Sequence, residues 1–89
     1  MGLHDDIRQH LQENMVLPYL SRGVKTLHVE ARQVGDEMHL DNRYPAICSV
    51  LDGRKFLDEN GLRIAGRVGP KQSPTVEWWF ERTSPPQEA

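Results

Sequence analysis

The sequence predicts a small α+β domain in which helices come first and a β-hairpin comes last. Apolar side chains recur at helical spacing in residues 3–15, 30–39 and 42–60. Residues 62–67 and 76–81 instead alternate apolar and polar side chains, which is typical of strands with one buried face. With 89 residues, of which 37% are apolar, the chain suffices for one modest core. We therefore expect a single domain.

The first element is predicted to be an amphipathic helix. Leu3, Ile7 and Leu11 recur every four residues and form one apolar stripe, while charged and amide side chains fill the other faces. Pro18 lacks a backbone N–H, and its ring clashes with the preceding turn of a helix. We therefore expect this helix to end or kink near Leu17.

A loop over residues 21–23 is expected to lead into a short strand over residues 24–29, where branched apolar residues alternate with polar ones. From residue 30 the apolar spacing changes to three and four, which predicts a second helix over residues 30–39. Gly35 lies inside this helix. A glycine there costs about 1 kcal/mol relative to alanine, so its presence indicates close packing against a neighbouring element.

A third helix is predicted over residues 42–52. Asp41 and Asn42 are favourable N-caps, and Pro45 lies in the first turn, where a missing N–H is harmless. The apolar stripe of this helix consists of Ile47, Val50 and Leu51.

The helical spacing is interrupted at Asp52 and Gly53 and resumes over residues 54–60. Gly61 then provides a left-handed C-terminal stop. We interpret residues 54–60 as a follow-on helical turn, and the Asp-Gly pair as the joint between the two parts.

The C-terminal part predicts a hairpin with strands over residues 62–67 and 76–81 and a long tip that contains two prolines. Alternation places Trp78 and Phe80 on the buried face and Trp79 on the opposite one. The domain is expected to cover residues 1–83, and residues 84–89 to form a disordered tail.

The order of helix, short strand, helix, helix and two-stranded wing resembles the winged helix-turn-helix DNA-binding superfamily. The segment TLHVEARQVGDEMHLDNRYPAICSVLDG resembles its strand and helix-turn-helix, and LRIAGRVGPKQSPTVEWWFE resembles its wing. The resemblance covers the chain from Leu3 to about Arg82 and depends on element order and periodicity.

In this superfamily the third helix enters the major groove of DNA, and the wing contacts the backbone or the minor groove. The resemblance therefore implies DNA contacts from polar residues of the third helix, the follow-on turn and the wing. These residues are Asn42, Arg43, Tyr44, Ser49, Arg54, Lys55, Arg67, Lys71, Gln72 and Ser73. Arginine can donate two hydrogen bonds to guanine or phosphate, and hydroxyl groups can bind phosphate. The joint at Asp52 and Gly53 would swing Arg54 and Lys55 toward the phosphate backbone.

Because the predicted reading helix carries few basic residues, DNA affinity should be modest and sensitive to salt. A homodimer would compensate by reading two half-sites at once. The candidate dimer contacts are Leu3, Ile7 and Leu11 on the first helix, together with Trp79. Alternatively, Trp79 would cover the first helix within its own chain.

The charge distribution leaves two functions open. The net charge is −2, yet residues 43–82 carry seven Lys and Arg against five Asp and Glu. This small basic excess favours double-stranded DNA as the partner, in transcription regulation or as an accessory factor in another DNA transaction. The acidic first half and Trp79 favour instead a protein-interaction module that does not bind DNA.

The sequence offers little for catalysis or cofactor binding. No pair among the four histidines and Cys48 has the spacing of a zinc site, so we expect no metal. Cys48 lies in an apolar run without a base, which favours a structural role over a nucleophilic one. We therefore expect a protein that is not an enzyme and needs no cofactor.

The apolar runs are far shorter than the roughly 20 residues that span a bilayer, and the N-terminus has no signal-peptide pattern. One cysteine cannot form an internal disulfide. We expect a cytoplasmic protein without a membrane partner.

Overall fold

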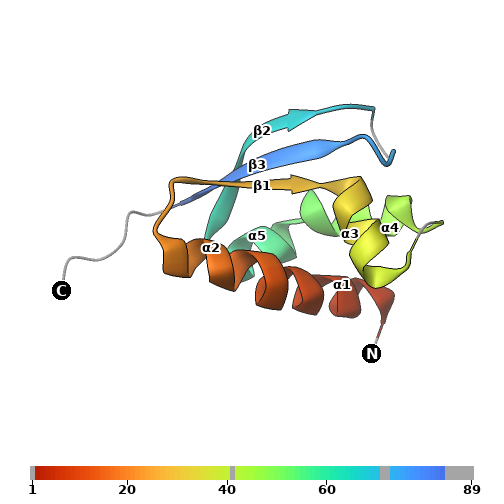
Figure 1. Cartoon of the computed structure of the whole chain (residues 1–89), viewed down its shortest axis with the longest axis horizontal. Helices are drawn as coiled ribbons and strands as arrows, with labels where there is room; N and C mark the ends of the chain where they lie inside the picture. Colours follow the sequence, from red (N-terminus) through yellow and green to blue (C-terminus); the bar gives the residue numbers. More distant parts are fainter. Residues whose placement is uncertain (1, 41, 71–72, 84–89) are drawn as a thin grey trace.

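The computed structural model of the chain describes residues 2–40, 42–70 and 73–83 (Figure 1). It is an α+β fold, as predicted, with the helices on one side of a three-stranded antiparallel sheet. Among the residues described, no helix is long and apolar enough to cross a membrane. The predicted tail, residues 84–89, lies outside the described residues. The elements in chain order are α1 (Leu3–Leu11), η1 (Gln12–Val16), α2 (Leu17–Arg22), β1 (Thr26–Glu30), α3 (Ala31–Met38), α4 (Tyr44–Leu51), α5 (Arg54–Asn60), β2 (Leu62–Val68) and β3 (Glu77–Arg82).

The first helix does not end near Leu17. The distortion that the proline imposes is instead a π-helical turn, η1, in which the N–H of Leu17 donates to the carbonyl of Gln12. Pro18 then lies in the first turn of α2, where its missing N–H is tolerated. The helical path continues to Gly23, whose φ of 69° ends it, so only the last residue of the predicted loop over residues 21–23 is outside the helix.

Helices α3, α4 and α5 follow the predicted spacing, but the start of α4 differs. Its N-cap is Arg43 rather than Asn42, and no side chain caps the helix. The turn before it is closed by a backbone bond of 3.1 Å from the Arg43 N–H to the Leu40 carbonyl, which leaves Arg43 as the last non-helical residue. The other predicted cap, Asp41, lies outside the described residues. Gly61, at φ 63°, ends α5 as predicted.

The sheet has the order β1-β3-β2, and both pairings are antiparallel. The predicted hairpin is confirmed and consists of β2 and β3. Strand β1 pairs with β3 along its whole length. This strand begins at Thr26, two residues later than predicted. Figure 1 shows the consequence: β3 is the central strand, and one face of the sheet is left without a covering helix.

A β-bulge at Ala65 changes the predicted facing of β2. Ile64 pairs with Phe80, whereas Gly66 pairs with Trp79 and Arg67 pairs with Trp78. The extra residue moves Arg67 from the open face to the face that carries the core, where its guanidinium lies 5.5 Å from the Trp78 ring.

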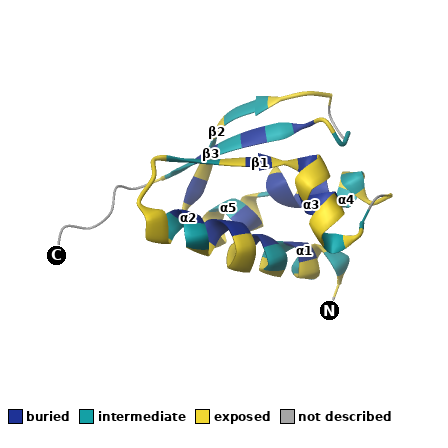
Figure 2. Ribbon diagram, viewed as in Figure 1, coloured by how far each residue is buried: buried dark blue, intermediate teal, exposed yellow. Residues whose placement is uncertain are grey.

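The core lies between the helices and the inner face of the sheet (Figure 2). Trp78 and Phe80 are completely buried, as their alternation predicts, and the ring of Phe56 from α5 packs edge-on against Phe80. The predicted stripe of α4 is also buried, and α1 contributes Ile7 and Leu11. At the contact between α3 and α4, a Cβ on Gly35 would lie 2.9 Å from Cε1 of Tyr44, so close packing does explain this glycine.

Candidate nucleic-acid interface

The start of α4 presents two exposed polar side chains. Asn42 and Arg43 are exposed, and neither side chain forms a hydrogen bond or ion pair within the described residues. The first N–H groups of α4 have no side-chain cap, and Pro45 in this turn has no N–H to offer. Uncapped N–H groups and a neighbouring guanidinium make this helix start attractive to a phosphate.

Tyr44, another predicted contact, packs against α3. Its half-buried ring lies over Gly35, so close that a Cβ on Gly35 would collide with the ring. The ring therefore fixes the approach of α3 to α4 and positions the exposed residues beside it.

The base of the β2–β3 loop, residues 69–76, is attached to the same helices. The Ala31 and Arg32 N–H groups at the start of α3 donate to the carbonyls of Val76 and Pro74, at 2.9 and 3.1 Å. Cys48 Sγ lies 4.0 Å from the Ser73 carbonyl oxygen, beside the middle of α4. The structure thus brings Ser73 close to α4, where Ser49 is exposed. Lys71 and Gln72, the other predicted contacts of this loop, lie outside the described residues.

Arg54 and Lys55 do not join this surface. Arg54 is 87% exposed and lies 3.8 Å from Asp58, and it lines a hollow between α5 and β2. Lys55 lines a separate hollow between α5 and α1. The pKa of Asp5 beside this hollow is lowered mainly by a hydrogen bond from the Gly2 N–H and by Arg8, and the charge of Lys55 adds a smaller effect. The predicted swing of both side chains toward one phosphate backbone is therefore not supported by their placement.

The joint after α4 is held by a network that sequence reasoning missed. Asp52 Oδ1 accepts a hydrogen bond of 2.7 Å from the Trp78 indole and one of 3.0 Å from Arg67 Nε. Arg67, predicted to contact DNA, is thus part of the link between α4 and the sheet. A buried tryptophan N–H needs a hydrogen-bond acceptor. The carboxylate of Asp52, at the end of a helix that packs on the sheet, was therefore the signal in the sequence that could have revealed this network.

Gly53 completes the joint. A Cβ on this residue would lie 2.9 Å from the carbonyl oxygen of Ser49, an atom of the α4 backbone. The chain can therefore turn this closely from α4 into α5 because residue 53 has no side chain.

Several remaining charges are paired away from α4. Arg8 forms an ion pair with Asp5, and Arg63 lies 2.8 Å from Glu81 on β3. The hydrogen bond from Arg63 is the main cause that lowers the pKa of Glu81. These pairs leave Arg43 as the described basic side chain best placed beside the start of α4.

Cys48 has the properties of a structural residue. Burial is the main cause that raises the pKa of its thiol, and the charge of Asp52 acts in the same direction. A raised pKa disfavours the thiolate, which is the nucleophilic form.

The predicted dimer contacts on α1 are placed differently by the structure. Ile7 and Leu11 are completely buried in the core of their own chain, and Leu3 packs against that core. Trp79 does not cover α1 either, because it lies on the open face of the sheet and stacks on His28 with ring centroids 4.8 Å apart. Of this group, Trp79 is the residue left on a face that no helix covers.

No family model, curated protein or solved structure matches the chain.

Proposed function

We propose that this chain is a winged helix-turn-helix domain that binds double-stranded DNA, in transcription regulation or another DNA transaction. The element order and the strand order β1-β3-β2 support the fold assignment. The observation that carries the function is the start of α4. Here Asn42 and Arg43 are exposed and have no side-chain partner among the described residues, and the neighbouring loop is anchored to α3.

The dimensions and charge of α4 suit this role. Eight residues give a helix about 12 Å long, comparable with the width of the major groove. The N-terminus of α4 is the positive end of the helix dipole, and Arg43 lies at this end. The dipole and the guanidinium therefore both attract phosphate. The Ser73 carbonyl lies beside Cys48 in the middle of α4, and Ser49 on this helix is exposed.

The number of available basic groups limits the affinity. With about two to four phosphate contacts, a plot of log affinity against log salt should have a slope of about −2 to −4. A homodimer would need a surface other than the stripe of α1, since Ile7 and Leu11 are buried in the core.

Arg43→Ala is expected to weaken binding to a labelled duplex about tenfold at low salt, as measured by fluorescence anisotropy. The substitution should leave stability unchanged, because Arg43 caps α4 through its backbone and not its side chain. The matched control is Arg63→Ala, which removes the same charge from β2, where the side chain is already paired with Glu81. Undetectable binding of the wild-type chain at low salt, or equal losses in the two variants, would refute the proposal.

A second candidate is a protein-interaction module without DNA binding. The pairing of Arg8, Arg63 and Arg67 with carboxylates favours it, as does the uncovered sheet face around Trp79. In this case Trp79→Ala would abolish capture of a protein partner, while Arg43→Ala would leave that capture unchanged.

A further inference from the structure

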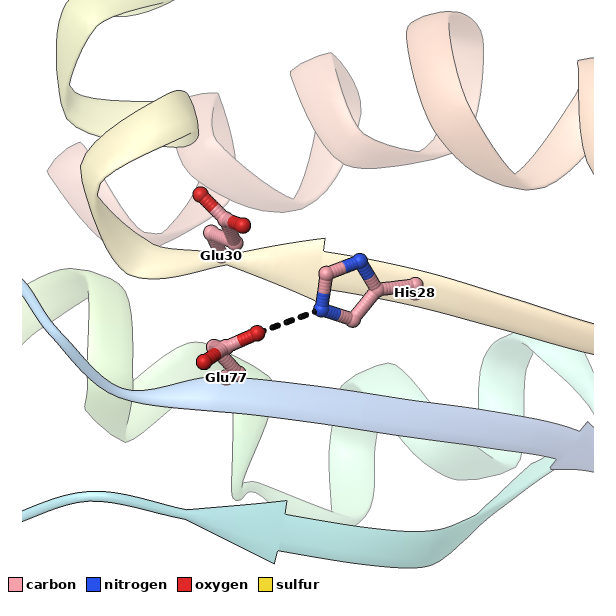
Figure 3. A group of neighbouring side chains, drawn as sticks. All are labelled: His28, Glu30 and Glu77. Carbon is pink, nitrogen blue, oxygen red and sulfur yellow. Dashed lines mark hydrogen bonds and ion pairs between the residues drawn. The ribbon is translucent and has the colours of Figure 1, made fainter.

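The open face of the sheet gathers three potential metal ligands from two strands. Glu30 and Glu77 are directly opposite each other in the β1–β3 pairing, and His28 lies two residues before Glu30 on β1. One ligand atom from each side chain lies within 4.8 Å of those of the other two (Figure 3). His28 and Glu30 are separated by one residue on a strand, and Glu77 is far from both in the sequence. The spacing rules for zinc motifs therefore do not detect this group.

The geometry around His28 is already organised. Its Nε2 lies 2.8 Å from Glu77 Oε1, and its ring stacks on Trp79 at an interplanar angle of 28°. The stack on Trp79 restricts the direction of the imidazole, and a cation held by both side chains would replace the hydrogen bond between His28 and Glu77.

The two carboxylates create an unfavourable charge that a cation would relieve. Like charges directly opposite on adjacent strands are destabilising. Glu30 has no hydrogen bond or ion pair within the described residues, and the ion-pair partner of Glu77 among them is His28. Arg32 lines the hollow beside both glutamates but forms no ion pair with either. Both glutamates thus reach the surface beside this hollow.

We propose that His28, Glu30 and Glu77 form a binding site for a divalent transition-metal cation, with Zn²⁺ as the best chemical match. Zinc binds imidazole nitrogen and carboxylate oxygen at about 2.0–2.2 Å, so its ligands in a tetrahedral site are about 3.3 Å apart. A separation of at most 4.8 Å closes to this value by rotation of exposed side chains on a fixed strand pair. Three protein ligands leave one position for water. The proposal is independent of DNA binding at α4.

The test is calorimetric titration of the purified full chain with Zn²⁺, with tryptophan fluorescence as a second readout. We expect one Zn²⁺ per chain and a change in Trp79 emission, because Trp79 is in contact with His28. Glu30→Gln is the sharpest variant, since this side chain is exposed and has no partner in the part of the chain that the structure describes, so its loss should not affect folding. It should weaken binding at least tenfold, because even the loss of a group that only orients a ligand typically costs about 10- to 100-fold in metal affinity.

The matched control is His10→Ala. His10 and Glu37 form a comparable pair at 2.7 Å, but no third ligand accompanies them in the described part of the chain. This variant should bind Zn²⁺ as the wild type does, and His28→Ala should not bind it. The proposal is overturned if the wild-type chain does not bind Zn²⁺, if Glu30→Gln binds with wild-type affinity, or if His10→Ala loses as much affinity as His28→Ala.

Discussion

Trp78→Ala is expected to lower the free energy of unfolding by about 4 kcal/mol, a large part of the stability of a small domain. The indole is completely buried, so truncation leaves a cavity in the core. It also removes the hydrogen bond to Asp52 and the ring beneath Arg67, which together link α4 to the sheet. Urea denaturation followed by circular dichroism measures this change without using tryptophan emission.

The control for this variant is Trp79→Ala, the adjacent residue on the opposite face. It loses a half-exposed ring and a stack on His28, and should cost only about 1 kcal/mol. Equal losses at the two positions would mean that the inner and outer faces of β3 are wrongly assigned.

Gly53→Ala has the second largest expected effect, a destabilisation of about 2 kcal/mol. The φ of −85° at this position suits alanine, so the penalty comes from the added methyl group. That group would be forced against the carbonyl of Ser49, and a backbone atom cannot rotate away. Chemical denaturation of the purified variant provides the measurement.

Gly66→Ala is the corresponding control, because its added methyl group would meet Trp79 at an ordinary 3.5 Å. It should leave stability unchanged or raise it slightly, through lower entropy of the unfolded chain. If Gly53→Ala were as stable as Gly66→Ala, the close turn between α4 and α5 would be incorrect.

Periodicity in the sequence predicted most of the local structure. The alternation in residues 76–81 correctly placed Trp78 and Phe80 on the buried face and Trp79 on the open face, because successive side chains of a strand point to opposite faces of the sheet. The end of α5 at Gly61 was also predictable, because glycine adopts the positive φ at this position without strain.

Features that depend on more than one element were not predictable in this way. The bulge at Ala65 reversed the facing of Arg67, and nothing in the alternation of β2 indicates an extra residue. Pro18 was predicted to end or kink the helix near Leu17, and the structure shows that the distortion is a π-helical turn directly before α2.

The candidate site was predicted less completely than the fold. Ile7 and Leu11 form an apolar stripe that suits either a dimer contact or a core, and a small domain needs that stripe for its own core. Arg54 and Lys55 are adjacent in the sequence, so a helix directs them into different hollows. The grouping of His28 with Glu77 depends on strand pairing, which spacing along the chain cannot show.

We propose that α4 and the β2–β3 loop form the DNA-binding surface. Its most direct test is to follow backbone amide chemical shifts while duplex DNA is added to the full chain at low salt. We expect the largest changes at Asn42, Arg43, Ser49 and Ser73, with little change at Arg63 or Trp79 on the open face of the sheet. Changes concentrated on that open face, or no changes at any DNA concentration, would contradict it.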